Sequence, residues 1–173
     1  PYCCAPARSS KRWKARSPRW KPSWPTSPPR PVPPALSLAL VNSRARAGVS
    51  APPVRVEVHL SGGLPSTQIV GLPEAAVRES RDRVRAAILC AQFEFPTRRI
   101  TVNLAPADLP KDGGRFDLPI ALGILAASGQ IRRESLADYE FLGELSLTGE
   151  LRAVDGVLPD ALAVPATGCT LAL

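Results

Sequence analysis

The stretch "PADLPKDGGRFDLPIALGILAASG", residues 106–129, decides the fold and raises the question of catalysis. Residues 118–128 are apolar on every side, which is typical of a helix buried within a domain rather than lying on its surface. Asp117 stands directly before this run and is predicted to cap the helix. A rigid proline and a glycine pair can present one side chain at a helix entrance, as a peptidase presents its nucleophile. The side chain presented here belongs to Arg115.

Alternating segments on either side of this stretch predict strands. Residues 54–60 alternate strictly between apolar and other side chains, residues 98–104 alternate from Ile100 onward, and residues 36–41 form a short apolar run. The turn "SGGLP" leads from residues 54–60 into "STQIVGL" and predicts a hairpin between these two segments. Further along the chain, two short strands are expected about a turn near residues 148–149.

A second helix is predicted from Pro73, which suits the first position of a helix, to about Phe93. Spacings of three and four residues define its buried stripe: Val77, Ser80, Val84, Ala87, Ile88 and Ala91. Two i,i+4 pairs are expected on the outward face, Glu74 with Arg78 and Glu79 with Arg83. The charged residues of that face are Glu74, Arg78, Glu79, Arg81, Asp82, Arg83 and Arg85. Two interpretations of this face remain: a solvated surface laced with salt bridges, or a surface whose arginines meet phosphate or a neighbouring subunit.

These elements predict a two-layer α/β (α+β) domain with a mixed sheet and two main helices. The chain has 173 residues, enough for one domain with a sizeable core. No apolar run approaches the roughly 20 residues that span a bilayer, and the cysteine spacing fits neither a metal site nor a disulfide framework. We therefore expect a cytoplasmic protein that neither enters a membrane nor binds a metal.

Residues 1–35 differ in composition from the rest of the chain. They hold eight basic residues and no acidic ones, ten of the 20 prolines and all three tryptophans, with no hydrophobic period. This segment is predicted to be a disordered leader, either non-native or a basic arm that binds nucleic acid. Residues 36–173 carry 14 basic and 15 acidic residues, so the predicted domain is almost neutral.

Several long motifs resemble those of a known family and occur in the same order as in that family. They are "LALVNSRARAG", "LPSTQIVGLPEAAVRESRDRVRAAI", "FPTRRITVNLAPADLPKDGGRFDLPIALGILAASGQI" and "FLGELSLTGELR". They look like the N-terminal domain of the ComM/YifB family of magnesium-chelatase-like AAA+ proteins, over about residues 36–160. The resemblance implies a fold similar to the Lon protease domain and to the C-terminal domain of RadA. It also implies a downstream AAA+ ATPase module as partner, a homo-hexamer, and a role in DNA recombination, branch migration and natural transformation.

The Lon comparison bears on catalysis. Lon-type peptidases present a serine in "PKDGPSAG", and the matching position holds Arg115, while the position of their partner lysine holds Pro159. Lys111 is the only lysine after residue 35, and arginine stays protonated and cannot serve as the base. We therefore expect no catalytic residue. Because no G-x-x-x-x-G-K-[ST] motif occurs, ATP and Mg²⁺ are expected only in an AAA+ module outside this chain.

The arginine and the lysine in "PKDGGR" are instead interpreted as binding groups. Two glycines at a helix N-terminus let the backbone approach an anion such as a DNA phosphate. Alternatively, Arg115 pairs with Asp112, Asp117 or a carboxylate of the next subunit and fixes the loop. The candidate DNA or subunit contacts are Lys111, Asp112, Gly113, Gly114, Arg115, Asp117, Arg78, Arg81 and Arg85.

The chain departs from the family pattern after about Gly156. Pro165 falls inside the Ala-rich helix expected there, which predicts a truncated or frame-disrupted end and leaves the last strand in doubt. Three functions follow from these observations. The first is the non-catalytic domain of a DNA-processing AAA+ protein, the second is a Lon-type serine peptidase, and the third is a basic nucleic-acid-binding protein that acts through residues 1–35.

Overall fold

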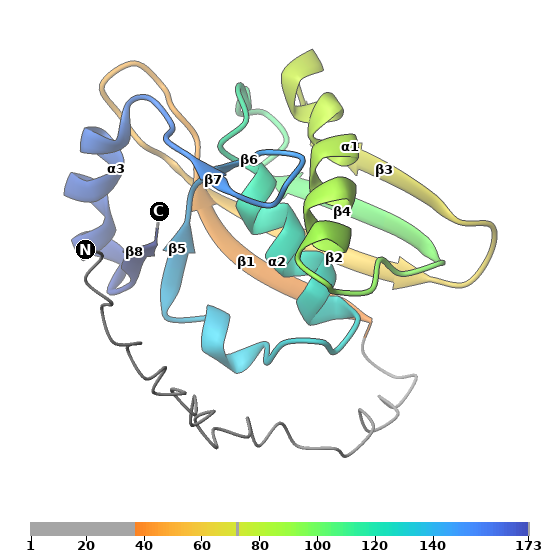
Figure 1. The fold of residues 1–173 in the computed structure, drawn as a ribbon. Helices are drawn as coiled ribbons and strands as arrows, with labels where there is room; N and C mark the ends of the chain where they lie inside the picture. Colours follow the sequence, from red (N-terminus) through yellow and green to blue (C-terminus); the bar gives the residue numbers. More distant parts are fainter. Residues whose placement is uncertain (1–36, 72, 173) are drawn as a thin grey trace, which may run out of the picture. The chain divides into compact units, whose positions relative to one another are not determined.

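The computed structural model describes residues 37–71 and 73–172, and in this part of the chain six strands form one mixed sheet (Figure 1). The strand order is β3-β4-β2-β1-β5-β8. β2 runs antiparallel to both β1 and β4, and the other three pairings are parallel. The strands are β1 (Leu38–Arg44), β2 (Pro53–Ser61), β3 (Ser66–Val70), β4 (Arg99–Ala105), β5 (Tyr139–Phe141) and β8 (Thr170–Ala172). The predicted leader, residues 1–35, lies outside the described residues.

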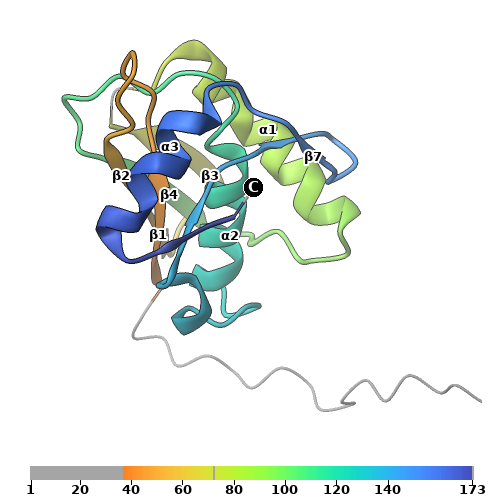
Figure 2. The same ribbon diagram turned by 90° about the vertical axis from the view of Figure 1, so that its left-hand side faces the viewer.

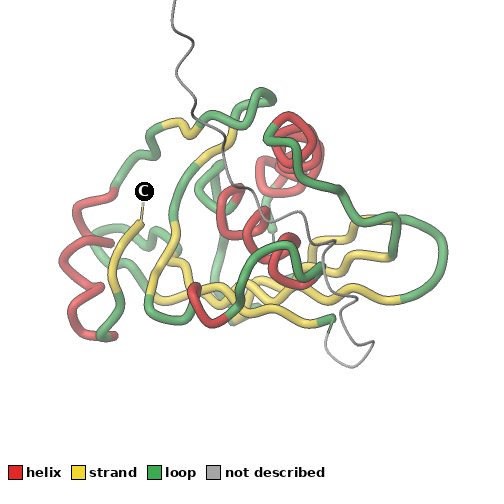
Figure 3. The backbone as a smooth tube through the Cα atoms, turned by 60° about the horizontal axis from the view of Figure 1, so that its bottom comes forward, coloured by secondary structure: helices red, strands yellow, loops and turns green. Residues whose placement is uncertain are grey.

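Helices α1 (Ala75–Cys90) and α2 (Asp117–Ala127) cover the same face of this sheet (Figures 2 and 3). Helix α3 (Val157–Ala163) lies beyond β5, at the end of the sheet that β8 closes (Figure 1). Two short 3₁₀ helices span Glu134–Leu136 and Val164–Thr167. A small hairpin of β6 (Glu144–Leu145) and β7 (Leu151–Arg152) turns near residues 148–149, as predicted. The two-layer α/β prediction is confirmed.

The core lies between α1, α2 and the helix-facing residues of the central strands. Val56 and Val58 of β2 are fully buried, as are Ile100, Val102 and Leu104 of β4. The predicted alternation of both strands is thus confirmed. The all-apolar helix is buried on nearly every side, also as predicted, because it lies between the sheet, α1 and the β6–β7 hairpin.

The predicted hairpin between β2 and β3 is wrong. β4 lies between these strands, pairing antiparallel with β2 and parallel with β3. Every second residue of β4 is fully buried, whereas β3 has no buried residue. The strand with the more apolar helix-facing side therefore takes the central place, and β3 becomes an edge strand.

The ends of both main helices also differ from the prediction. Pro73 precedes α1 rather than starting it, since Glu74 is the N-cap residue, and Ala91 at the C-cap is exposed instead of buried. Asp117 does not cap α2: the N-cap residue is Phe116, and Asp117 lies inside the first turn without a capping hydrogen bond. Its carboxylate is used for an ion pair described below.

The segment after Gly156 forms both a helix and a strand. Pro165 ends the α-helical hydrogen-bonding pattern, and the chain continues as a 3₁₀ turn instead. β8 then pairs in parallel with β5, with Tyr139 opposite Thr170. The last strand, which the sequence left in doubt, is therefore formed in the described residues.

Candidate functional site

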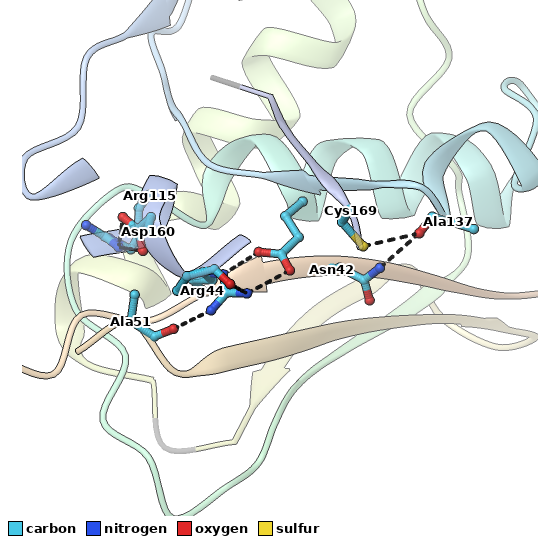
Figure 4. Close-up of polar contacts among 9 residues, drawn as sticks. Asn42, Arg44, Ala51, Arg115, Ala137, Asp160 and Cys169 are labelled. Atoms are coloured by element: carbon cyan, nitrogen blue, oxygen red, sulfur yellow. Dashed lines mark hydrogen bonds and ion pairs between the residues drawn. The ribbon is translucent and has the colours of Figure 1, made fainter. Parts of the chain in front are cut away.

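The "PKDGGR" loop connects β4 to α2 and places Arg115 in the interior. Only 5% of its side chain is exposed, and its guanidinium Nη1 lies 3.2 Å from Oδ2 of Asp160 on α3 (Figure 4). Its Nη2 donates to the Asp155 carbonyl at 2.6 Å. The interpretation in which Arg115 fixes the loop fits this geometry, but with Asp160 in place of Asp112 or Asp117. The Arg115 guanidinium is thus occupied by Asp160 and the Asp155 carbonyl, and only its edge borders the pocket beside this loop.

A second buried ion pair lies beside the first. Arg44 on β1 pairs with Glu140 on β5, donating from Nη2 to Oε1 at 3.0 Å. The same guanidinium donates to the carbonyls of Ala51 and Ala163, at 2.7 and 3.3 Å (Figure 4). We call Arg44, Glu140, Arg115 and Asp160 the buried charge cluster. It joins α3 to the sheet and to the loop before α2.

Burial raises the pKa of Asp160 above its ordinary value, against the opposing effect of the Arg115 guanidinium. Sequence reasoning missed both Asp160 and Glu140 as partners. One feature of the sequence could have indicated that Asp160 is paired: it is the only charged residue in the otherwise apolar segment 157–164. A lone carboxylate within such a helix is usually paired when it is buried.

Lys111 is fully buried, and its ammonium donates to the carbonyl of Pro106. Burial lowers the pKa of this lysine. Its own carbonyl accepts a hydrogen bond from the Glu74 N–H at 3.2 Å, which joins the loop to the start of α1. The side chain is thus part of the loop's interior and does not project toward a partner.

Asp117 is also fully buried and pairs with Arg83 on α1. Arg83 donates from Nε to Oδ2 at 2.7 Å and from Nη2 to Oδ1 at 3.1 Å, and the Leu145 N–H donates to Oδ2 at 3.2 Å. Arg83 therefore faces α2 rather than solvent, so the prediction that it points outward is wrong, although the charge of Glu79 still acts on it. Burial raises the pKa of Asp117 despite the hydrogen bond from Arg83, which acts to lower it. This contact ties α1, α2 and β6 together.

The accessible part of the loop is Asp112, Gly113 and Gly114, which border a shallow pocket with Arg46 and Glu144. Asp112 pairs with Arg46 at 3.3 Å. Gly114 lies against Glu144, whose carboxylate would clash with a Cβ added at this position. Arg46 and Arg115 line this pocket beside Asp112, Glu144 and Asp155, so its walls carry no excess of positive charge.

Neither of the two positions that match the Lon dyad holds a side chain able to act in it. Arg115, at the position matching the Lon nucleophile, cannot act as a base because its guanidinium stays protonated. Pro159, at the position matching the lysine, lies on α3 and has no side-chain donor or acceptor. Within the described residues, no three His, Cys, Asp or Glu side chains come together in a metal-binding arrangement.

The predicted contacts on α1 are exposed: Arg78, Arg81 and Arg85. Arg81 and Arg85 line a groove together with Arg98, residues 65–67 and residues 95–97. We call it the arginine groove. Arg98 was not among the predicted site residues, and contact of the α1 arginines with DNA or another subunit stays a prediction.

Comparison with known proteins places this chain in a family. The family described as subunit ChlI of Mg-chelatase matches residues 56–173. The chain belongs to the ChlI family. Its relatives include the competence protein ComM of Haemophilus influenzae, which is 62% identical over 128 residues, 74% of this chain and 25% of that protein. The YifB proteins of Salmonella typhimurium and Escherichia coli are 58% and 57% identical over 126 residues, 73% of this chain and 25% of each.

The predicted resemblance to the ComM/YifB group within the ChlI family is confirmed by these identities. The chain spans about a quarter of the length of these relatives. None of the helices in the described ranges combines the length and the apolar character needed to cross a membrane.

Proposed function

We propose that this chain is the non-catalytic N-terminal domain of a ComM-type magnesium-chelatase-like AAA+ protein that processes DNA in recombination, branch migration and natural transformation. The 62% identity to a competence protein supports this role. On this proposal, ATP and Mg²⁺ bind in an AAA+ module outside this chain. The assembled protein is a cytoplasmic homo-hexamer, and this domain contacts the motor, its neighbours or DNA.

One structural observation carries the non-catalytic part of the proposal. The guanidinium of Arg115 is held by Asp160 and by the Asp155 carbonyl, at the loop position where the related peptidases hold a nucleophile. A buried ion pair there joins α3 to the loop and leaves no group to attack a peptide bond. In this chain the loop therefore has a structural role, which is to hold α3 against the domain.

A peptidase assay tests this part directly. The purified chain is incubated with unfolded casein beside an active Lon-type peptidase, and ATP hydrolysis is followed in parallel. We expect no cleavage, because the described loop holds no nucleophile with a base, and no ATP hydrolysis, because no G-x-x-x-x-G-K-[ST] motif occurs in the chain. Casein cleavage that disappears when a single serine is replaced by alanine would overturn the proposal.

A domain transplant tests the role in DNA processing. The 128-residue aligned region of the Haemophilus influenzae ComM is replaced by the matching region of this chain, and transformation frequency is measured. We expect the chimera to support transformation, whereas deletion of the region abolishes it. A folded, normally abundant chimera that gives the frequency of the deletion strain would contradict the proposal.

A further inference from the structure

The arginine groove lies between the C-terminal half of α1, the connection leading to β4, and the start of β3. Figure 1 shows α1 beside β3 and β4 at this end of the sheet. Its walls carry the guanidinium groups of Arg81, Arg85 and Arg98, and the hydroxyl groups of Ser66 and Thr67. The buried charge cluster contributes no residue to it, so the groove is separate from the "PKDGGR" loop.

Helical spacing extends this positive surface along α1. Arg78, Arg81 and Arg85 are separated by three and four residues, so they lie on one flank of the helix. At a rise of about 1.5 Å per residue, this row covers roughly 10 Å. Arg83 lies on the other flank, where it pairs with Asp117. Arg81 and Arg85 line the groove, and Arg78 continues the row on the same flank, away from the Arg83–Asp117 pair.

The positive charge of the groove is only weakly compensated. Asp82 is the one acid on its walls, and its carboxylate lies 3.3 Å from Nε of Arg81 with 75% of its side chain exposed. This single carboxylate stands against three guanidinium groups, so the walls keep a net positive charge. Arg85 packs over the Phe95 ring at 4.6 Å, which orders its guanidinium without neutralising it. Arg98 is exposed and has no ion-pair partner in the described part of the chain.

We infer that the arginine groove binds the phosphodiester backbone of a nucleic-acid strand. Guanidinium groups form paired hydrogen bonds with phosphate, and serine and threonine hydroxyls are common additional donors to it. A row of separated cations suits a polymer of evenly spaced phosphates better than a single small anion. This inference rests on the proposed DNA-processing function and assigns the contact to this groove rather than to the loop at Arg115.

Binding of labelled DNA by two variants of equal charge tests the inference. The full chain, Arg81→Gln/Arg98→Gln, and the control Arg55→Gln/Arg132→Gln are titrated against a fluorescent single strand at several salt concentrations. Arg55 and Arg132 are exposed and lie outside the groove. Arg85 is kept because it packs on Phe95. All three proteins retain the basic residues 1–35, so any contribution of that segment is common to them.

We expect the groove variant to reduce the slope of log Kobs against log salt by about 1.4, because each lost phosphate contact on a single strand removes about 0.7. The control should keep the slope of the unmodified chain. Thermal denaturation shows whether both variants are folded. Equal slopes for two folded variants would overturn the inference. Duplex DNA and single-stranded RNA of matched length show which strand geometry the groove prefers.

Polyglutamate of matched charge distinguishes an acidic protein from a nucleic acid. We expect it to bind more weakly than DNA and to respond equally to both variants. If it bound as tightly as DNA and lost affinity only in the groove variant, the groove would be a site for acidic protein and the inference would be wrong. The two proposals can fail separately. If the chimera supports transformation but the groove variant and the control give equal slopes, this inference is wrong and the proposed function stands.

Discussion

The guanidinium of Arg115 lies 3.2 Å from the carboxylate of Asp160, with 5% and 1% of the two side chains exposed. Asp160 is the buried residue of α3, whereas Leu158 and Leu162 on the same helix are 71% and 74% exposed. An ionic contact, with the adjoining hydrogen bonds of Arg44, therefore replaces the usual apolar face in holding this helix. Buried charges of this kind are costly when one partner is removed.

Arg115→Met should lower the free energy of unfolding by about 3 kcal/mol at neutral pH, because it leaves the Asp160 carboxylate buried without its cation. Removal of the guanidinium raises the pKa of Asp160 further above its ordinary value, so the acid takes up a proton more readily. The loss of stability should therefore shrink in mild acid. Urea denaturation at neutral and mildly acidic pH measures both effects.

The double variant Arg115→Met/Asp160→Asn is the matched control, because it removes both charges and should recover most of the lost stability. Asp82→Asn, which breaks an exposed pair on α1, should change the free energy of unfolding by less than about 0.5 kcal/mol. A double variant no more stable than Arg115→Met would show that the arginine stabilises the loop by some means other than this pair.

Asp117 gives a prediction about pH. Its pKa in the folded protein lies above the ordinary value of 3.8, so between these two values the folded state binds more protons than the unfolded state. Its contribution to stability is therefore present in acid and is lost as pH rises through that window. The free energy of unfolding of the unmodified chain, minus that of Asp117→Asn, should decrease over this range. A difference that grew with pH would mean that pairing with Arg83 outweighs burial.

Local periodicity explains why much of the fold could be predicted. The alternation of residues 54–60 and 98–104, and the all-apolar run after Asp117, each specify an element and its buried side without reference to the rest of the chain. The place of β4 between β2 and β3 could not be predicted in this way. Strand order depends on which apolar surfaces meet in three dimensions, and the turn after β2 suits a hairpin equally well.

The charged site was harder to predict than the fold. Arg115 and Asp160 are 45 residues apart, and Arg83 and Asp117 are 34 apart, so only the folded topology brings them together. The identity of Arg115 was enough to predict the loss of a peptidase nucleophile. Its partner was not predictable, because Asp112 and Asp117 stand much closer in sequence and offer the same chemistry.

Lys111 provides a test of a buried charge whose hydrogen bond goes to the Pro106 carbonyl and on which Asp108 acts only through its charge. Lys111→Met should keep the free energy of unfolding within about 1 kcal/mol of the unmodified chain, or raise it, because an apolar side chain of similar length replaces a buried ammonium. The Lys111 carbonyl still accepts from Glu74 in this variant. Lys111→Ala should cost more, about 2 to 3 kcal/mol, because it leaves a cavity. Equal losses above 3 kcal/mol in both variants, measured by urea denaturation, would show that the ammonium itself stabilises the loop.

The contact of α2 with β2 supplies the last prediction, because a Cβ at Gly123 would lie 2.5 Å from Cγ2 of Val58. Gly123→Ala should lower the free energy of unfolding by about 1 to 2 kcal/mol, since overpacking outweighs the gain in helix propensity of about 1 kcal/mol. Val58→Ala removes the obstructing methyl groups, so adding Gly123→Ala to that variant should cost less than it does alone, or stabilise. Gly62→Ala, with no atom within 4 Å of the added Cβ, should change stability by less than about 0.5 kcal/mol. Thermal and urea denaturation of the four variants measure this, and a Gly123→Ala chain as stable as the unmodified one would show that α2 can move away from β2 without loss.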